Sequence, residues 1–186
     1  MSEESRAAGD KNRIGNWFQT YTGKEFYIRD PRPEEINILD IAHALSNQCR
    51  FNGHCLEFYS VAQHSILVSR TCEPENALWG LLHDAAEAYC GDIVRPLKVD
   101  MPLYNDVESR LVDCVVAKFE LTPELQPEDV TKADNIALRT EKRDIISNEP
   151  RPWRIAHLKP LDEKIICLPP FEAKAAFLQR FLELTT

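Results

Sequence analysis

The residues with the clearest capacity for chemistry lie between His83 and Asp92. His83, Asp84, Glu87 and Asp92 fall within ten positions of the chain. Burying several unpaired carboxylates is unfavourable unless a cation neutralises them. One imidazole among three carboxylates therefore indicates a bound divalent metal ion. The neighbouring residues are apolar, as expected of a buried helix: Leu78, Trp79, Leu81, Leu82, Ala85, Ala86 and Ala88.

Helical spacing lets these side chains act together. Glu87 follows His83 by four positions and Asp84 by three, so it is expected one turn above them on the same side. One imidazole and one carboxylate do not complete a coordination sphere. His64 and Asp134, each in the middle of another apolar helical stripe, are the expected additional ligands. This nitrogen and oxygen set suits one Mn, Co, Zn, Fe or Ni ion, with Mg also an option.

Other residues of similar type have simpler explanations. A single buried histidine is more often a hydrogen-bonded core residue than a metal ligand. His43, His54 and His157 have no comparable acidic neighbours and are expected to be structural or surface residues. Cys90 adjoins the cluster, but one thiol without a partner more often contributes to packing.

Length and composition favour one soluble globular unit. The chain has 186 residues, of which 44% are hydrophobic and 28% charged. This length supports one domain with a substantial core, expected at residues 14–186 after a flexible tail at residues 1–13. No apolar run is long enough to span a membrane, and the N-terminus has no apolar signal core. We therefore expect a cytoplasmic protein that does not associate with membranes.

The net charge of −8 argues against stable binding to nucleic acid, which needs clustered basic residues over a whole face. A small anionic ligand requires only local positive charge beside a metal. Arg50, Arg95 and Lys98 are the basic residues nearest the acidic cluster or its preceding loop. The six cysteines form no C-x-x-C pair and are expected to be reduced.

Periodicity and turn residues predict a mostly α-helical bundle with a small N-terminal hairpin. Two aromatic and β-branched runs around Thr22-Gly23 predict the hairpin. A loop rich in functional side chains, residues 49–59, precedes the second helix. A short extended piece is expected at residues 165–168. Helices are expected at residues 34–48, 60–70, 75–90, 102–119, 127–147 and 171–184.

The sequence resembles the HD-domain metal-dependent phosphohydrolases. Their signature of a histidine, a later His-Asp pair and a final aspartate is matched by His64, His83-Asp84 and Asp134. Residues 83–98 also resemble the longer HD-x-x-E-x-x-x-G-D-x-x-x-P-x-K block of bacterial 5′-deoxynucleotidases and phage deoxynucleoside triphosphohydrolases. The similarity covers about residues 45–143, and it includes Arg50 with the following aromatic residue, Phe51.

This resemblance implies a role for each matching residue. Glu87 would position or deprotonate the attacking water, and Asp92 would support that water or the sugar hydroxyl. Phe51 would lie near the base or sugar, and Pro96 would shape the pocket wall. The resemblance also implies a metal held by His64, His83, Asp84 and Asp134, and a phosphate neutralised by Arg50 and Lys98.

The activity implied is metal-dependent hydrolysis of a deoxynucleotide. A 5′-deoxynucleotidase, which converts a dNMP to deoxynucleoside and phosphate, comes first. The alternative is a triphosphohydrolase that releases triphosphate from a dNTP such as dATP. Arg95, or the basic residues Arg139, Lys142 and Arg143, would then supply charge beyond the α-phosphate. An alternative of another class is a non-catalytic, metal-stabilised nucleotide-binding protein. The resemblance also favours a homo-oligomer, a dimer or larger.

Overall fold

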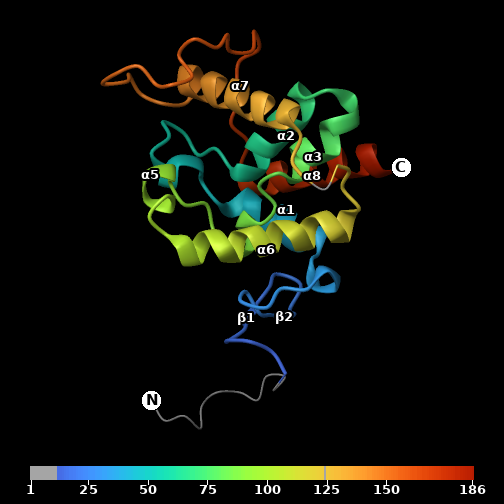
Figure 1. Ribbon diagram of the computed structural model, residues 1–186. Coiled ribbons are helices and arrows are strands. Elements are labelled where there is room, and N and C mark those ends of the chain that lie inside the picture. Colours follow the sequence, from blue (N-terminus) through green and yellow to red (C-terminus); the bar gives the residue numbers. More distant parts are fainter. Residues whose placement is uncertain (1–11, 124) are drawn as a thin grey trace.

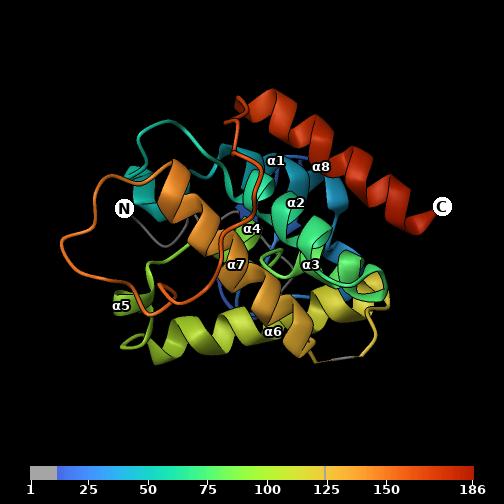
Figure 2. The ribbon, with the colours of Figure 1, turned by 90° about the horizontal axis from the view of Figure 1, so that it is seen from above.

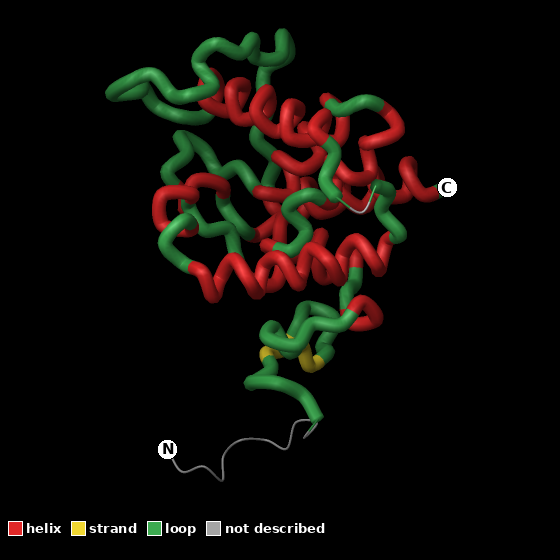
Figure 3. Tube along the Cα trace, viewed as in Figure 1, coloured by secondary structure: helices red, strands yellow, loops and turns green. Residues whose placement is uncertain are grey.

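The computed structural model describes residues 12–123 and 125–186, which form a helical bundle with a small hairpin at one end (Figures 1 and 3). The expected mostly α-helical fold and N-terminal hairpin are confirmed. The flexible tail expected at residues 1–13 lies largely outside the described residues. Arg13, at its end, already pairs with Asp30 and Glu35.

The elements follow the predicted order, with several short helical turns between the long helices. They are β1 (Phe18–Gln19), β2 (Glu25–Phe26), η2 (Pro33–Glu35), α1 (Ile38–Asn47), η3 (Arg50–Gly53), α2 (Val61–Thr71), η4 (Pro74–Asn76), α3 (Ala77–Leu82), α4 (Glu87–Cys90), α5 (Arg95–Lys98), α6 (Pro102–Phe119), α7 (Glu128–Asp144) and α8 (Pro170–Thr185).

Helix α2 lies at the centre of the bundle and contacts α1, α3, α7 and α8 (Figure 2). Its buried residues include Val61, Ala62, Ile66 and Val68, which join one hydrophobic core with residues of the surrounding helices. Ser60 caps its N-terminus by accepting a hydrogen bond from Gln63 N at 3.1 Å, as the sequence predicts. No helix in the described part of the chain is long and apolar enough to cross a membrane.

The helix expected at residues 34–48 is divided into η2 and α1. Ile36 and Asn37 have extended backbone conformations between the two elements. Asn37 accepts a hydrogen bond from Leu39 N at 2.9 Å and so caps a new helix start. The side-chain cap outweighs the continuous apolar periodicity that predicted one helix.

The helix expected at residues 75–90 is also interrupted, at the predicted metal ligands His83 and Asp84. Residues 83–86 separate α3 from α4. Here Ala85 N donates to Leu82 O, and Glu87 N donates to Asp84 O, at 2.9 and 3.0 Å. These bonds span three residues, so the chain is wound more tightly than an α-helix, a geometry often found at functional sites. Gly91, with φ of 84°, ends α4 as predicted.

The hairpin is fixed to the bundle through the buried carboxylate of Asp40. Its two oxygens accept hydrogen bonds from Thr22 N at 2.7 Å and from Thr22 Oγ1 at 2.9 Å. Phe26 of β2 stacks on Tyr89 of α4 with ring centroids 4.3 Å apart. The hairpin therefore supports α1 and α4 from outside the bundle.

Residues 145–169 form an irregular connection between α7 and α8. The extended piece expected at residues 165–168 forms no strand in the described chain. Side chains hold it instead: Ile165 N donates to Asp144 Oδ2 and Leu168 N donates to Gln63 Oε1, each at 2.9 Å. The connection is thus positioned by α2 and α7.

Helices α2 and α3 approach closely at Gly80. A Cβ atom added there would lie 2.4 Å from Cys72 Sγ and 3.0 Å from Ser69 Cα. We predict that Gly80→Ala lowers the free energy of unfolding by roughly 1–3 kcal/mol because it overpacks this contact. Urea denaturation measures the change.

Cys72→Ala provides the control for this prediction. The double variant Gly80→Ala/Cys72→Ala should recover part of the loss, because only the contact with Ser69 remains. An unchanged stability in Gly80→Ala would show that the two helices can separate without cost.

Candidate metal centre and adjoining cavity

Three helical elements bring the predicted metal ligands together. His64 comes from α2, His83 follows α3 directly, and Asp134 comes from α7. One ligand atom from each of these residues lies within 4.8 Å of the other two. The His64 Nε2 atom is 3.1 Å from Asp134 Oδ1. The structure therefore joins residues that are up to 70 positions apart in the sequence, from 64 to 134.

Asp84 lies beside the same two imidazoles. Its Oδ2 atom is 3.2 Å from His83 Nε2 and 3.7 Å from His64 Nε2. Burial raises the pKa of Asp84, but the adjacent His83, His64 and Arg50 outweigh it and bring the pKa well below its usual value. Asp84 thus lies beside the group formed by His64, His83 and Asp134, and it is ionised.

Hydrogen bonds at Nδ1 turn the Nε2 atom of both imidazoles toward the cluster. His83 Nδ1 lies 2.8 Å from Gly80 O, and a carbonyl oxygen only accepts, so the proton is on Nδ1. His64 Nδ1 lies 2.6 Å from a carboxylate oxygen of Glu141 and is a donor by the same argument. Both Nε2 atoms are buried and face carboxylates without a hydrogen bond of good geometry in the described chain. Burial and Arg50 lower the pKa of His64, but Glu141 and Asp134 outweigh them and raise it to about 9, so a metal would displace a proton from His64 Nε2. Unpaired, buried nitrogens beside two carboxylates fit a divalent metal ion.

Glu141 is a site residue that the sequence analysis missed. It is fully buried on α7, and its second oxygen accepts a hydrogen bond from Arg50 Nη2 at 3.3 Å. Burial raises the pKa of Glu141, but His64 and Arg50 lower it below its ordinary value overall. The carboxylate therefore orients the His64 ring. It follows Asp134 by two helical turns, so its place on the buried stripe of α7 was the available signal.

Glu87 and Asp92 lie close to the predicted metal ligands, and the pKa of each is raised. Glu87 is buried at 8% exposure, and its Oε2 atom has no hydrogen-bond partner in the described chain. Burial, with the nearby Asp84 and Asp92 carboxylates, raises the pKa of Glu87 well above its ordinary value. Burial likewise raises the pKa of Asp92. A carboxylate with a raised pKa and a free oxygen is a stronger base than an ordinary carboxylate and is suited to accept a proton.

Arg50 connects the metal cluster to the preceding loop. Its guanidinium lies 3.9 Å from carboxylate oxygens of both Asp84 and Asp92, in addition to its bond with Glu141. Its side chain is 13% exposed, so it is largely enclosed by acidic groups. The guanidinium also lies over the Phe51 ring, 5.2 Å from the centroid. Arg50 thus balances the buried carboxylates and places positive charge beside the metal cluster.

Phe51 adopts a backbone conformation that is unusual for a bulky residue. Phe51 and Asn52 have φ values of 55° and 51°, in the left-handed region. The flanking bonds fix this turn: Arg50 N donates to Tyr59 O at 2.9 Å, and Cys55 Sγ contacts Arg50 O at 3.3 Å. Strain of this kind persists where the surrounding structure imposes it, often at ligand sites.

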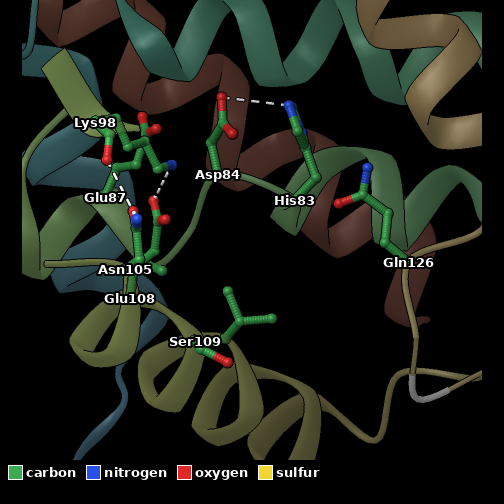
Figure 4. A pocket seen from close by; sticks show the side chains of 10 residues that line it. His83, Asp84, Glu87, Lys98, Asn105, Glu108, Ser109 and Gln126 are labelled. Atoms are coloured by element: carbon green, nitrogen blue, oxygen red, sulfur yellow. Dashed lines mark hydrogen bonds and ion pairs between the residues drawn. The ribbon is translucent and has the colours of Figure 1, made fainter. Parts of the chain in front are cut away.

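Two cavities lie near the cluster: His83 and Asp84 line one of them, whereas none of the four predicted metal ligands lines the other, which meets the cluster through Arg50 and Asp92. The smaller one, of about 320 Å³, is lined by His83, Asp84 and Glu87 on one side and by α6 residues on the other (Figure 4). Lys98 points into it and pairs with Glu108 at 2.5 Å. Its charged lining has three carboxylates, Asp84, Glu87 and Glu108, and one ammonium, Lys98, a balance that suits water better than phosphate.

The larger cavity has a volume of about 1030 Å³, at the upper end of the range for ligand pockets. It brings together all of the substrate-binding residues predicted from the sequence: Arg50, Phe51, Arg95, Pro96 and Lys98. Asp92 also lines it. The opposite wall contains residues 151–155, including Trp153, which the sequence analysis did not place.

The remaining histidines lie away from the cluster. His43 stacks on Tyr21 with ring centroids 3.8 Å apart, and His54 and His157 are exposed. Cys90 contacts Tyr104, and all six cysteines are free. These positions agree with the structural or surface roles expected for them.

We predict that Glu141→Gln weakens the affinity for Mn²⁺ by roughly 10- to 100-fold, the usual effect of removing a partner of a metal-bound histidine. The amide lacks the charge that holds His64 Nδ1 as a donor. Titration with Mn²⁺, followed by electron paramagnetic resonance, measures the free ion. Exposed Glu57→Gln is the matched control, and equal affinities for the two variants would contradict the role of Glu141.

Comparison with profiles of known protein families finds no match. Two proteins are similar over most of the chain. The uncharacterized protein YfdR of Escherichia coli is 40% identical over 172 residues, which cover 91% of this chain and 96% of YfdR. The uncharacterized protein RCAP_rcc00048 of Rhodobacter capsulatus is 32% identical, covering 88% and 93% of the two chains. The chain therefore belongs to the same family as YfdR and RCAP_rcc00048.

Proposed function

We propose that the protein is a metal-dependent phosphohydrolase that acts on deoxynucleotides. The observation that carries this proposal is the convergence of two unpaired imidazole nitrogens beside two carboxylates, next to a large cavity containing cationic and aromatic residues. His64, His83, Asp84 and Asp134 would hold the metal. When bound, it would supply Lewis acidity toward a phosphoryl oxygen and make water more acidic.

The residues around the cluster account for the other requirements of hydrolysis. Glu87 has a free oxygen and a raised pKa, so we assign it the role of accepting a proton from the attacking water. Arg50 would bind phosphoryl oxygens and stabilise the charge that develops on them. Asp92 lies between the cluster and the larger cavity, where it could accept a hydrogen bond from the sugar hydroxyl.

The larger cavity favours a nucleotide over a small phosphoester. Phe51 and Trp153 provide aromatic surface, and Ile93, Val94 and Leu138 provide further apolar contacts. Such a lining, with a few charged groups, is typical of sites for aromatic ligands.

Two reactions share this chemistry. Water and a dNMP would give deoxynucleoside and phosphate, and this reaction needs only the metal, Arg50 and Lys98 at the phosphate. Water and a dNTP would give deoxynucleoside and triphosphate. The triphosphate reaction is also a candidate because arginines line the outer part of the cavity. A metal-stabilised binding protein would not require the unpaired carboxylate of Glu87.

We predict that wild-type protein with Mn²⁺ releases phosphate or triphosphate from deoxynucleotides, and that Glu87→Gln lowers kcat by about 100-fold or more because the proton acceptor is lost. Chromatography of the products measures both. Mn²⁺ binding should be retained in Glu87→Gln.

The control is Glu75→Gln, an exposed residue outside the cavities. Unchanged turnover in Glu87→Gln would remove Glu87 from the mechanism. No product from any nucleotide would contradict the proposed function.

A further inference from the structure

Three arginines line the larger cavity without an acidic partner. Arg95, Arg151 and Arg154 are exposed, and the described chain places no carboxylate within ion-pair distance of any of them. The chain as a whole has a net charge of −8, so this local excess of positive charge is distinctive. Arginine clusters of this kind recognise phosphate groups.

Two of these arginines are brought to the cavity by the connection after α7. In Figures 1 and 2 this connection projects on the same side of the molecule as α5, which carries Arg95. The buried side chain of Ile155 anchors it to the body of the protein. Residues 151–155 thus form the cavity wall that faces α5 and the Phe51 loop.

The basic residues of α7 hold this connection in place. Arg139 Nε donates to Leu158 O at 3.4 Å, and Arg143 donates to Leu161 O and Glu163 O. None of the α7 residues Arg139, Lys142 and Arg143 lines the larger cavity, although the sequence analysis considered them as a source of charge for distal phosphates. Arg139 and Arg143 instead position the segment that carries Arg151 and Arg154.

Trp153 lies between these two arginines in the sequence and faces Phe51 across the cavity. The ring centroids are 6.2 Å apart and the planes are tilted by 53°. The strained backbone of Phe51 fixes one side of this aromatic pair. Two tilted rings leave an aromatic edge and face available to a planar base.

We propose that residues 151–154 determine substrate choice, and that the preferred substrate is a deoxynucleoside triphosphate. Trp153 contacts the base beside Phe51, while Arg151 and Arg154, together with Arg95, bind the phosphates beyond the one at the metal. The metal, Arg50 and Lys98 would be sufficient to bind a single phosphate. Three further guanidiniums are therefore more than a monophosphate needs. This assignment rests on the proposed function and extends it.

Binding of dATP and dAMP to the whole protein in EDTA tests the arginines without requiring turnover. Isothermal titration calorimetry should show dATP binding at least about tenfold tighter than dAMP, because the two additional phosphates form charged hydrogen bonds with the arginines. Arg151→Ala/Arg154→Ala should abolish most of this preference, whereas exposed Arg70→Ala, outside the larger cavity, should preserve it. Equal binding of dATP and dAMP by the wild type, or an unchanged preference in the double variant, would overturn the proposal.

Inorganic triphosphate separates the role of Trp153 from that of the arginines. Trp153→Ala should weaken dATP binding by roughly tenfold, the magnitude of one lost base stack, and leave triphosphate binding unchanged. Trp153→Phe should restore most of the dATP affinity, and Trp17→Ala, outside the larger cavity, should have no effect. Equal losses for dATP and triphosphate in Trp153→Ala would show a structural role only.

These binding results are independent of the proposed hydrolysis. A wild type that prefers dATP but hydrolyses no nucleotide would contradict the proposed function and leave residues 151–154 as a nucleotide-binding element. A wild type that hydrolyses dNMP and dNTP equally well, with no loss in the double variant, would contradict only the substrate assignment.

Discussion

The site depends on one constraint: His64 and His83 must both direct Nε2 to the same buried point. Gly80 allows α2 and α3 to approach closely enough, and its carbonyl fixes the proton of His83 on Nδ1. Glu141 does the same for His64. The two buried Nε2 atoms face the carboxylates of Asp134 and Asp84, where a divalent cation would take the place of the imidazole protons.

Much of the fold follows from local sequence signals. The bounds of α6, Pro102–Phe119, coincide with those predicted, because Pro102 begins an uninterrupted amphipathic pattern. The N-terminal cap of α2 at Ser60 and the hairpin turn around Thr22-Gly23 could also be predicted from the sequence. The grouping of His64 with Asp134 was also predictable, since ionisable residues in apolar stripes must meet inside the bundle.

Other features depend on tertiary contacts that periodicity does not encode. The tighter turn at residues 83–86 lies within a continuous apolar pattern, so one long helix was predicted where two form. Glu141 lies on the buried stripe of α7, but the charged sequence around it does not reveal its contact with His64. Residues 151–155 have no regular structure, and their position depends on hydrogen bonds from Arg139 and Arg143 to distant carbonyls.

The central claim is that His64, His83, Asp84 and Asp134 form a metal site, and anomalous diffraction from crystals soaked with Mn²⁺ tests it most directly. The account predicts an anomalous peak with His64 Nε2, His83 Nε2 and an oxygen of each aspartate at coordination distance, roughly 2.0–2.3 Å. The peak should be absent in His64→Ala crystals soaked in the same way. A saturated crystal with no peak at this cluster, or with a peak only elsewhere, would contradict the account.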